Sequence, residues 1–127
     1  MSPELAKLSL RLSVGILILF HGIHKIIYGV SGVKALLSKA GLPEFFAYGV
    51  YVGEVIIPVF IILGLYARIA SLFLAFTMLM AMFLAYWGSF FSLSKQGAPL
   101  IELPLLYFIL AIIIFLQGSG KFSVNNK

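Results

Sequence analysis

The chain has 127 residues, of which 62% are hydrophobic and only 10% are charged, and its mean hydropathy is +1.13. About a quarter of the residues in a soluble globular domain are charged, so this composition excludes that class and indicates an integral membrane protein. The formal charge of +5 comes from basic residues that stand singly near the ends of apolar segments, which is typical of membrane-flanking charges and argues against nucleic acid as a partner. The chain contains no cysteine, which excludes disulfides, thiolate metal ligands and dithiol redox pairs.

The apolar segments predict an all-α membrane protein with a single domain over residues 1–127. One crossing of the hydrocarbon core takes about 20 apolar residues, and three short polar interruptions leave room for four such segments. The expected fold is an antiparallel four-helix transmembrane bundle. Its helices are predicted at about 5–28, 44–66, 68–87 and 99–117, with an exposed polar tail at about 121–127.

The first helix is predicted to be retained in the membrane and not cleaved as a signal peptide. Ser2-Pro3-Glu4 provides a capping serine, a proline at the first helical position and an acid near the positive end of the helix dipole. The apolar run carries Arg11 and His21 and lacks the small-residue exit of a cleavage site. Gly29-Val30-Ser31-Gly32 ends this helix.

The connections between the helices carry further signals. Lys34 and Lys39 stand among apolar residues of the first loop, which predicts a short amphipathic helix at the membrane interface. Pro58 falls inside the second helix and predicts a kink, because proline removes one backbone hydrogen bond. The segment Gly64-Leu65-Tyr66-Ala67-Arg68 is so short that the second and third helices should form an antiparallel hairpin.

Basic residues suggest how the chain sits in a cell membrane. The side with both termini would carry Lys7, Arg11, Arg68, Lys121 and Lys127, and the other side Lys25, Lys34, Lys39 and Lys95. This slight excess predicts a multi-pass protein with both termini in the cytoplasm. Arg11 and Arg68 are expected to anchor lipid headgroups there.

Ionisable residues within the apolar segments are the main functional signal, because charge inside a membrane is costly. The residues are His21, His24, Lys25, Glu54 and Glu102. Glu54 follows the expected start of its helix by ten residues, about 15 Å at 1.5 Å per residue, which places it near the bilayer centre. The others, together with Tyr51, Tyr86 and Trp87, are expected in the same leaflet.

Helical spacing predicts that these groups form one buried pocket. Positions 14, 17, 18, 21, 24, 25 and 28 share one face of the first helix, so both histidines and Lys25 should turn inward. We predict that Glu54 pairs with His21 or His24, and that Lys25 pairs with Glu102. In this hypothesis Glu54, His21 and His24 are the catalytic groups, while Lys25, Tyr51, Glu102 and Trp87 contact the ligand.

Structural interpretations of the same residues remain open. Histidine and glutamate can hydrogen-bond between helices without a chemical role, and Lys25 and Glu102 lie close enough to the interface to snorkel. Tyr86 and Trp87 fit an aromatic belt. Two histidines three residues apart could ligate haem or a metal, but no third histidine is present and no metal site is predicted.

A set of short motifs resembles the DoxX family of small bacterial and archaeal membrane proteins over nearly the whole chain. The motifs are Arg11-Leu12 with Gly15, His21-Gly22-x-x-Lys25, Glu54, Gly64-Leu65-Tyr66-Ala67-Arg68, Glu102-Leu103-Pro104-Leu105-Leu106 and Gly118-Ser119-Gly120-Lys121-Phe122-Ser123. Their order and spacing carry the resemblance. The family's ending usually continues to an aspartate, where Asn125 stands here, which puts any role of that carboxylate in doubt.

The resemblance implies a four-helix membrane protein linked to redox metabolism, since relatives include the membrane part of thiosulfate:quinone oxidoreductase. The expected function is therefore a subunit of a quinone-linked oxidoreductase system, with quinone as candidate cofactor and with membrane lipid and other protein subunits as partners. The sequence has no flavin, haem or iron–sulfur motif of its own. Two alternatives are a non-catalytic accessory subunit of a larger membrane complex and a proton-coupled transporter that uses the carboxylate of Glu54.

Overall fold

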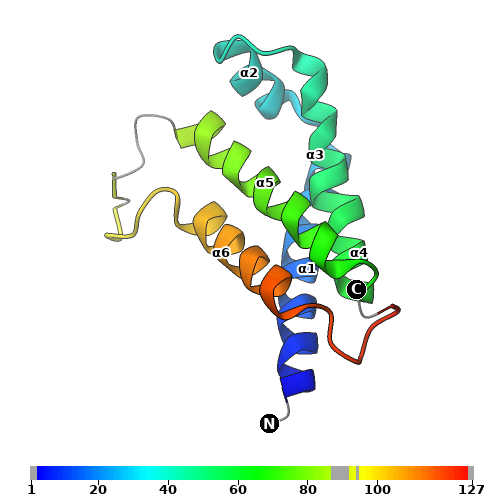
Figure 1. The fold of residues 1–127 in the computed structure, drawn as a ribbon. Coiled ribbons are helices and arrows are strands. Elements are labelled where there is room, and N and C mark those ends of the chain that lie inside the picture. Colours follow the sequence, from blue (N-terminus) through cyan, green and yellow to red (C-terminus); the bar gives the residue numbers. More distant parts are fainter. Residues whose placement is uncertain (1–2, 87–91, 94, 126–127) are drawn as a thin grey trace.

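The computed structural model describes residues 3–86, 92–93 and 95–125, and the regular secondary structure of these residues is helical (Figure 1). One isolated β-bridge joins Leu93 and Pro99. The elements are α1 (Pro3–Tyr28), α2 (Ser31–Lys39), the 3₁₀ helix η1 (Glu44–Tyr48), α3 (Gly49–Tyr51), the π-helical η2 (Val52–Ile56), α4 (Ile57–Leu63), α5 (Ala67–Tyr86) and α6 (Glu102–Gln117).

Three helical segments are long and apolar enough to cross a membrane. They are Pro3–Tyr28, the composite segment Glu44–Leu63 and Ala67–Tyr86. These segments confirm the prediction of a multi-pass, all-helical membrane protein. The shorter apolar helix α6 has 16 residues, and it packs mainly along α5.

The fourth predicted helix starts later than expected, at Glu102 and not near residue 99. The bridge between Leu93 and Pro99 keeps Pro99 extended. The Pro99 carbonyl then accepts a hydrogen bond from the Glu102 N–H at 3.1 Å, so a turn precedes the helix.

The second span changes its winding where a kink was predicted. Pro58 has no N–H, so the carbonyl of Glu54, four residues earlier, lacks its usual donor. The chain adopts π winding over Val52–Ile56, directly before α4, and such a local widening is one way in which a helix accommodates a missing bond. Glu54 therefore lies in the irregular turn of this span.

The predicted hairpin between the second and third spans is confirmed. Gly64 ends α4 in the left-handed conformation (φ 72°), Tyr66 also has a positive φ of 50°, and α5 begins at Ala67. Gly64 is the common C-terminal glycine of a helix. Only three residues separate the two helices.

The core lies where α1, α4, α5 and α6 meet. Its fully buried members include Val14, Ile18, Ile61, Leu74 and Ile114. Small residues at Ala67, Ala70, Ala75 and Ala111 also belong to this core, and small side chains let membrane helices approach closely.

The predicted short helix of the first loop is present as α2, with Leu37 buried on its inner face. Leu37, Val30 and Ala47 form a second, smaller apolar cluster. The Lys34 ammonium donates to the Tyr48 hydroxyl at 3.0 Å, and this hydrogen bond raises the pKa of Lys34. The α2 segment thus covers the beginning of the second span.

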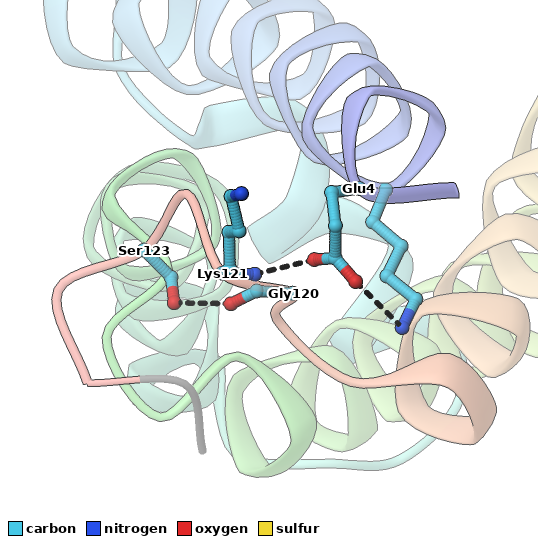
Figure 2. Close-up of polar contacts among 5 residues, drawn as sticks. Glu4, Gly120, Lys121 and Ser123 are labelled. Carbon is cyan, nitrogen blue, oxygen red and sulfur yellow. Dashed lines mark hydrogen bonds and ion pairs between the residues drawn. The ribbon is translucent and has the colours of Figure 1, made fainter. Parts of the chain in front are cut away.

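The segment predicted as an exposed tail keeps Lys121, Phe122 and Val124 exposed, yet it stays attached to the helices. It folds back across the ends of the helices (Figure 1). The Lys121 N–H donates to the Glu4 carboxylate at 2.6 Å, as Figure 2 shows, and the Val124 N–H donates to the Leu63 carbonyl at 3.0 Å. The Asn125 side-chain oxygen accepts from the Tyr66 N–H at 2.9 Å. Unbonded backbone groups at the helix ends attract this segment, because they lack partners of their own.

Arg11 is wholly buried and donates to the Phe122 carbonyl of this segment. Arg11 therefore does not lie at the surface, where it was expected to anchor lipid headgroups. The sequence pattern could not show this burial, because the covering residues come more than 100 positions later in the chain. Arg68 remains exposed.

Candidate functional site

A large, half-open groove of about 1200 Å³ runs between α1, α2, the second span, α5 and the start of α6. Most of its walls are apolar and include Leu36, Phe46, Phe73, Phe76, Met80 and Leu84. The polar lining residues are His21, Lys25, Glu54, Thr77, Tyr86 and Tyr107. Lys25 and Glu54 are the charged pair among them, so the groove combines a large apolar surface with one ionic group.

Lys25 and Glu54 form an ion pair in the groove wall. The Lys25 ammonium donates to Glu54 Oε2 at 2.5 Å. Glu54 is buried, with 7% of its surface exposed, whereas the Lys25 side chain keeps 29%. The Tyr51 hydroxyl donates to the Lys25 backbone carbonyl at 3.3 Å and so ties the second span to the same turn of α1.

This pairing corrects the predicted one. The partner of Glu54 in the described part of the chain is Lys25, in place of His21 or His24. Glu102 is exposed, and its carboxylate forms no ion pair with Lys25 there. Its neighbours Leu103 and Pro104 line the groove instead.

Two glycines fix the position of Glu54. A Cβ atom added to Gly22 of α1 would lie 2.1 Å from the Glu54 backbone oxygen, and one added to Gly53 would lie 2.4 Å from Thr77 Oγ1 of α5. The backbone of α1 and the Thr77 side chain of α5 therefore both pack directly against this turn. Close contact on both sides excludes lipid and holds the carboxylate beside Lys25.

The two histidines occupy different surroundings. His21 lines the groove, and its ring meets Tyr107 edge to face with centroids 6.2 Å apart. The His24 ring packs at a tilt against the Tyr28 ring, with centroids 4.6 Å apart, and His24 does not line the groove. At about 100° per residue, His21 and Lys25 are about 40° apart around the helix, but His24 and Lys25 are about 100° apart. The predicted joint inward turn thus holds for His21 and Lys25 only.

Tyr51 lies beside the ion pair, as described, and Trp87 lies outside the described residues. In the described part of the chain no group of three His, Asp or Glu residues could hold a metal ion.

Sequence reasoning missed Gly53, Thr77 and Tyr107, and it included Gly22 as a motif residue without its packing role. Gly22 directly follows His21, and Gly53 directly precedes Glu54. A glycine in the interior of a helix signals close backbone approach. That signal was available. Thr77 and Tyr107 had none, because a threonine or tyrosine in an apolar helix is compatible with many positions.

The geometry suits a largely apolar ligand that carries a hydrogen-bond acceptor. Lys25 is a donor with three N–H groups and Glu54 is an acceptor, and both stand at the wall of a space with aromatic and methionine side chains. Such a mixture of wide apolar surface and a few polar groups is typical of small-molecule sites.

Comparisons with known proteins agree with the motifs. The model of the DoxX family matches residues 6–87. The chain is 34% identical over 121 residues to a protein of Bacillus subtilis (strain 168) named "Putative oxidoreductase CatD", an alignment that covers 93% of this chain and 83% of that protein. No solved structure matches the chain.

Proposed function

This chain belongs to the DoxX family of membrane proteins, and from that premise we propose that it is a membrane subunit of an oxidoreductase system whose groove binds a quinone. The printed name of the relative from Bacillus subtilis describes an oxidoreductase and supports the redox part of the proposal. The observation that carries the quinone part is the Lys25–Glu54 ion pair in the wall of an apolar groove.

The groove residues fit such a ligand. A quinone joins a flat apolar ring and a lipid-like chain to two carbonyl acceptors, and when bound it accepts two electrons and two protons. The groove of about 1200 Å³ is slightly larger than the roughly 300–1,000 Å³ of ordinary ligand pockets. Lys25 can donate one N–H to a carbonyl while another remains on Glu54.

The roles of the residues follow from their positions. Lys25 orients the carbonyl, and the buried Glu54 carboxylate holds the Lys25 ammonium beside it. His21, at the groove wall beside Tyr107, has one ring nitrogen that can donate and one that can accept a hydrogen bond from a bound ligand. Tyr51 positions Lys25 through its backbone carbonyl. Ligand contacts of Glu102 and Trp87, and a catalytic role of His24, stay predictions from the sequence.

The electrons are proposed to come from a partner protein. This chain has no cysteine for an iron–sulfur cluster or a dithiol and no flavin-binding motif. A partner subunit that carries the redox centre is therefore part of the proposal.

We further propose that α6 completes an antiparallel four-helix bundle. Its 16 residues span about 24 Å at 1.5 Å per residue, somewhat less than the hydrocarbon core of about 30 Å. Three crossings leave the chain on the side opposite to its start, yet the segment after α6 contacts Glu4. A fourth crossing accounts for that return, and the excess of basic residues favours the cytoplasm for this side.

Quinone binding tests the proposal. Quinones quench tryptophan fluorescence, and Trp87 is the chain's single tryptophan, so a short-chain quinone can be titrated into the purified protein. We expect saturable binding whose Kd rises at least tenfold, about 1.4 kcal/mol, in Glu54→Gln and in Lys25→Met, because each variant breaks the ion pair.

The matched control is Lys39→Met, which removes a lysine that is exposed on α2 and outside the groove lining. It should bind like the wild type. Equal affinity in all three variants would contradict the quinone site and favour the accessory-subunit alternative, in which the polar residues serve packing alone.

A further inference from the structure

Arg11 lies far from the groove and has unused hydrogen-bonding capacity. Its side chain is fully buried, and Nη2 donates to the Phe122 carbonyl. Nε and Nη1 are buried with no hydrogen-bond partner among the described residues, and the same holds for the hydroxyl of Ser119. Three buried polar atoms at one end of the bundle thus lack acceptors or donors, although such atoms are nearly always bonded.

The surroundings of Arg11 are positively charged. The C-terminal segment passes Arg68 at Gly118 and Lys7 at Gly120, since added Cβ atoms there would lie 2.8 Å from Arg68 Nε and 3.2 Å from the Lys7 side chain. Arg11 Nη1 would lie 2.1 Å from a Cβ on Gly64. Several cations therefore enclose the short stretch that contains Ser119.

One acidic side chain lies near this stretch, because a Cβ on Gly120 would lie 3.0 Å from the Glu4 carboxylate, which pairs with Lys7 and not with Arg11. The ion pairs among the described residues are Lys7–Glu4 and Lys25–Glu54, and neither includes Arg11. The Glu4 carboxylate is already bonded to the Lys121 N–H (Figure 2). A buried cation with only a neutral acceptor is costly, so an anion from outside the chain would stabilise this arrangement.

We propose that a phosphate-class oxyanion binds beneath the C-terminal segment, between Arg11 and Ser119. An oxyanion offers several acceptor oxygens, which can take the N–H groups of Nε and Nη1 and the hydroxyl of Ser119. Arg68 and Lys7 add long-range attraction. Nε, Nη1 and the Ser119 hydroxyl are closed off in this arrangement, so the anion is accommodated only when the C-terminal segment shifts away from the helix ends.

Two sources share this chemistry, the phosphate of a lipid headgroup and a free inorganic phosphate. The experiment measures the thermal midpoint of the full chain, freed of lipid in a neutral detergent, with inorganic phosphate against chloride at equal ionic strength. The same measurement is made in vesicles of phosphatidylcholine with and without phosphatidylglycerol. A ligand that binds the folded state raises the midpoint in a saturable manner.

The expected result is a saturable rise of several degrees for the wild type, with the phosphate midpoint concentration at least tenfold higher in Ser119→Ala and no response in Arg11→Met. A rise with phosphate identifies the free anion as sufficient, and a rise with phosphatidylglycerol alone identifies the headgroup. Both outcomes support the site. Lys39→Met, which removes a cation at the opposite end, should respond like the wild type.

The proposal is overturned if neither probe moves the wild-type midpoint, or if Ser119→Ala responds as the wild type does. Ser119→Ala is informative even if Arg11→Met fails to fold, because alanine at this position deletes only a hydroxyl. Without a bound anion, that deletion removes a buried unbonded group and leaves the midpoint unchanged or higher.

Discussion

Lys25→Met is expected to lower the free energy of unfolding by about 3 kcal/mol, because it leaves a buried carboxylate without its partner. Glu54 has only 7% of its surface exposed, so water in the groove can replace little of what Lys25 provides. Glu54→Gln should cost less, about 1 kcal/mol, because the half-buried Lys25 can extend toward the interface.

The double variant Lys25→Met with Glu54→Gln separates this pair from general effects of the substitutions. It should be more stable than Lys25→Met alone, since no charge then remains buried. The measurement is equilibrium unfolding in mixed micelles of dodecyl maltoside and SDS, followed by circular dichroism, with Lys39→Met as a near-neutral control. Additive costs in the double variant would show that Lys25 and Glu54 do not interact.

The second large effect is expected for Gly22→Ala, with a loss of about 2–3 kcal/mol from overpacking. The added methyl group would lie 2.1 Å from the backbone oxygen of Glu54. Backbone atoms cannot rotate away as a side chain can, so α1 and η2 must separate. The separation would also loosen the ion pair, and we expect quinone affinity to fall together with stability.

Gly32→Ala is the matched control for Gly22→Ala. Gly32 lies in α2 with no other atom within 4 Å of an added Cβ, so alanine there should gain up to about 1 kcal/mol through its better helix propensity. Gly53→Ala should fall between the two, because the contacting atom belongs to the side chain of Thr77. If Gly22→Ala were as stable as Gly32→Ala, the close approach of α1 to Glu54 would be wrong.

The sequence predicted the helical segments well because each must present a long apolar run to lipid. The short helix α2 and the hairpin at Gly64 also followed from local patterns, namely lysines placed among apolar residues and a glycine in a short connection. The delayed start of α6 did not, since it depends on the contact between Leu93 and Pro99. Local sequence cannot show such a contact.

The sequence predicted the ionisable residues of the candidate site, but it did not predict which of them pair with one another. Helical spacing placed Lys25 and His21 on one face, and the cost of membrane charge singled out Glu54. Which charges meet depends on how the helices are rotated and how far each is shifted along its axis. That shift is set by the contact of Gly22 with the Glu54 carbonyl and by the π turn before Pro58. Counting residues from the start of a regular helix takes neither feature into account.

The bond from Arg11 to the Phe122 carbonyl has a consequence for the order of events during synthesis. The two residues are 111 positions apart, and at about 5–20 residues per second a ribosome needs roughly 5–20 s to pass from one to the other. During that interval α1 is already made while its arginine has no acceptor from the C-terminal segment. Until then Arg11 of the nascent chain must stay hydrated at the membrane interface. The C-terminal segment can cover Arg11 only after every helix has been inserted.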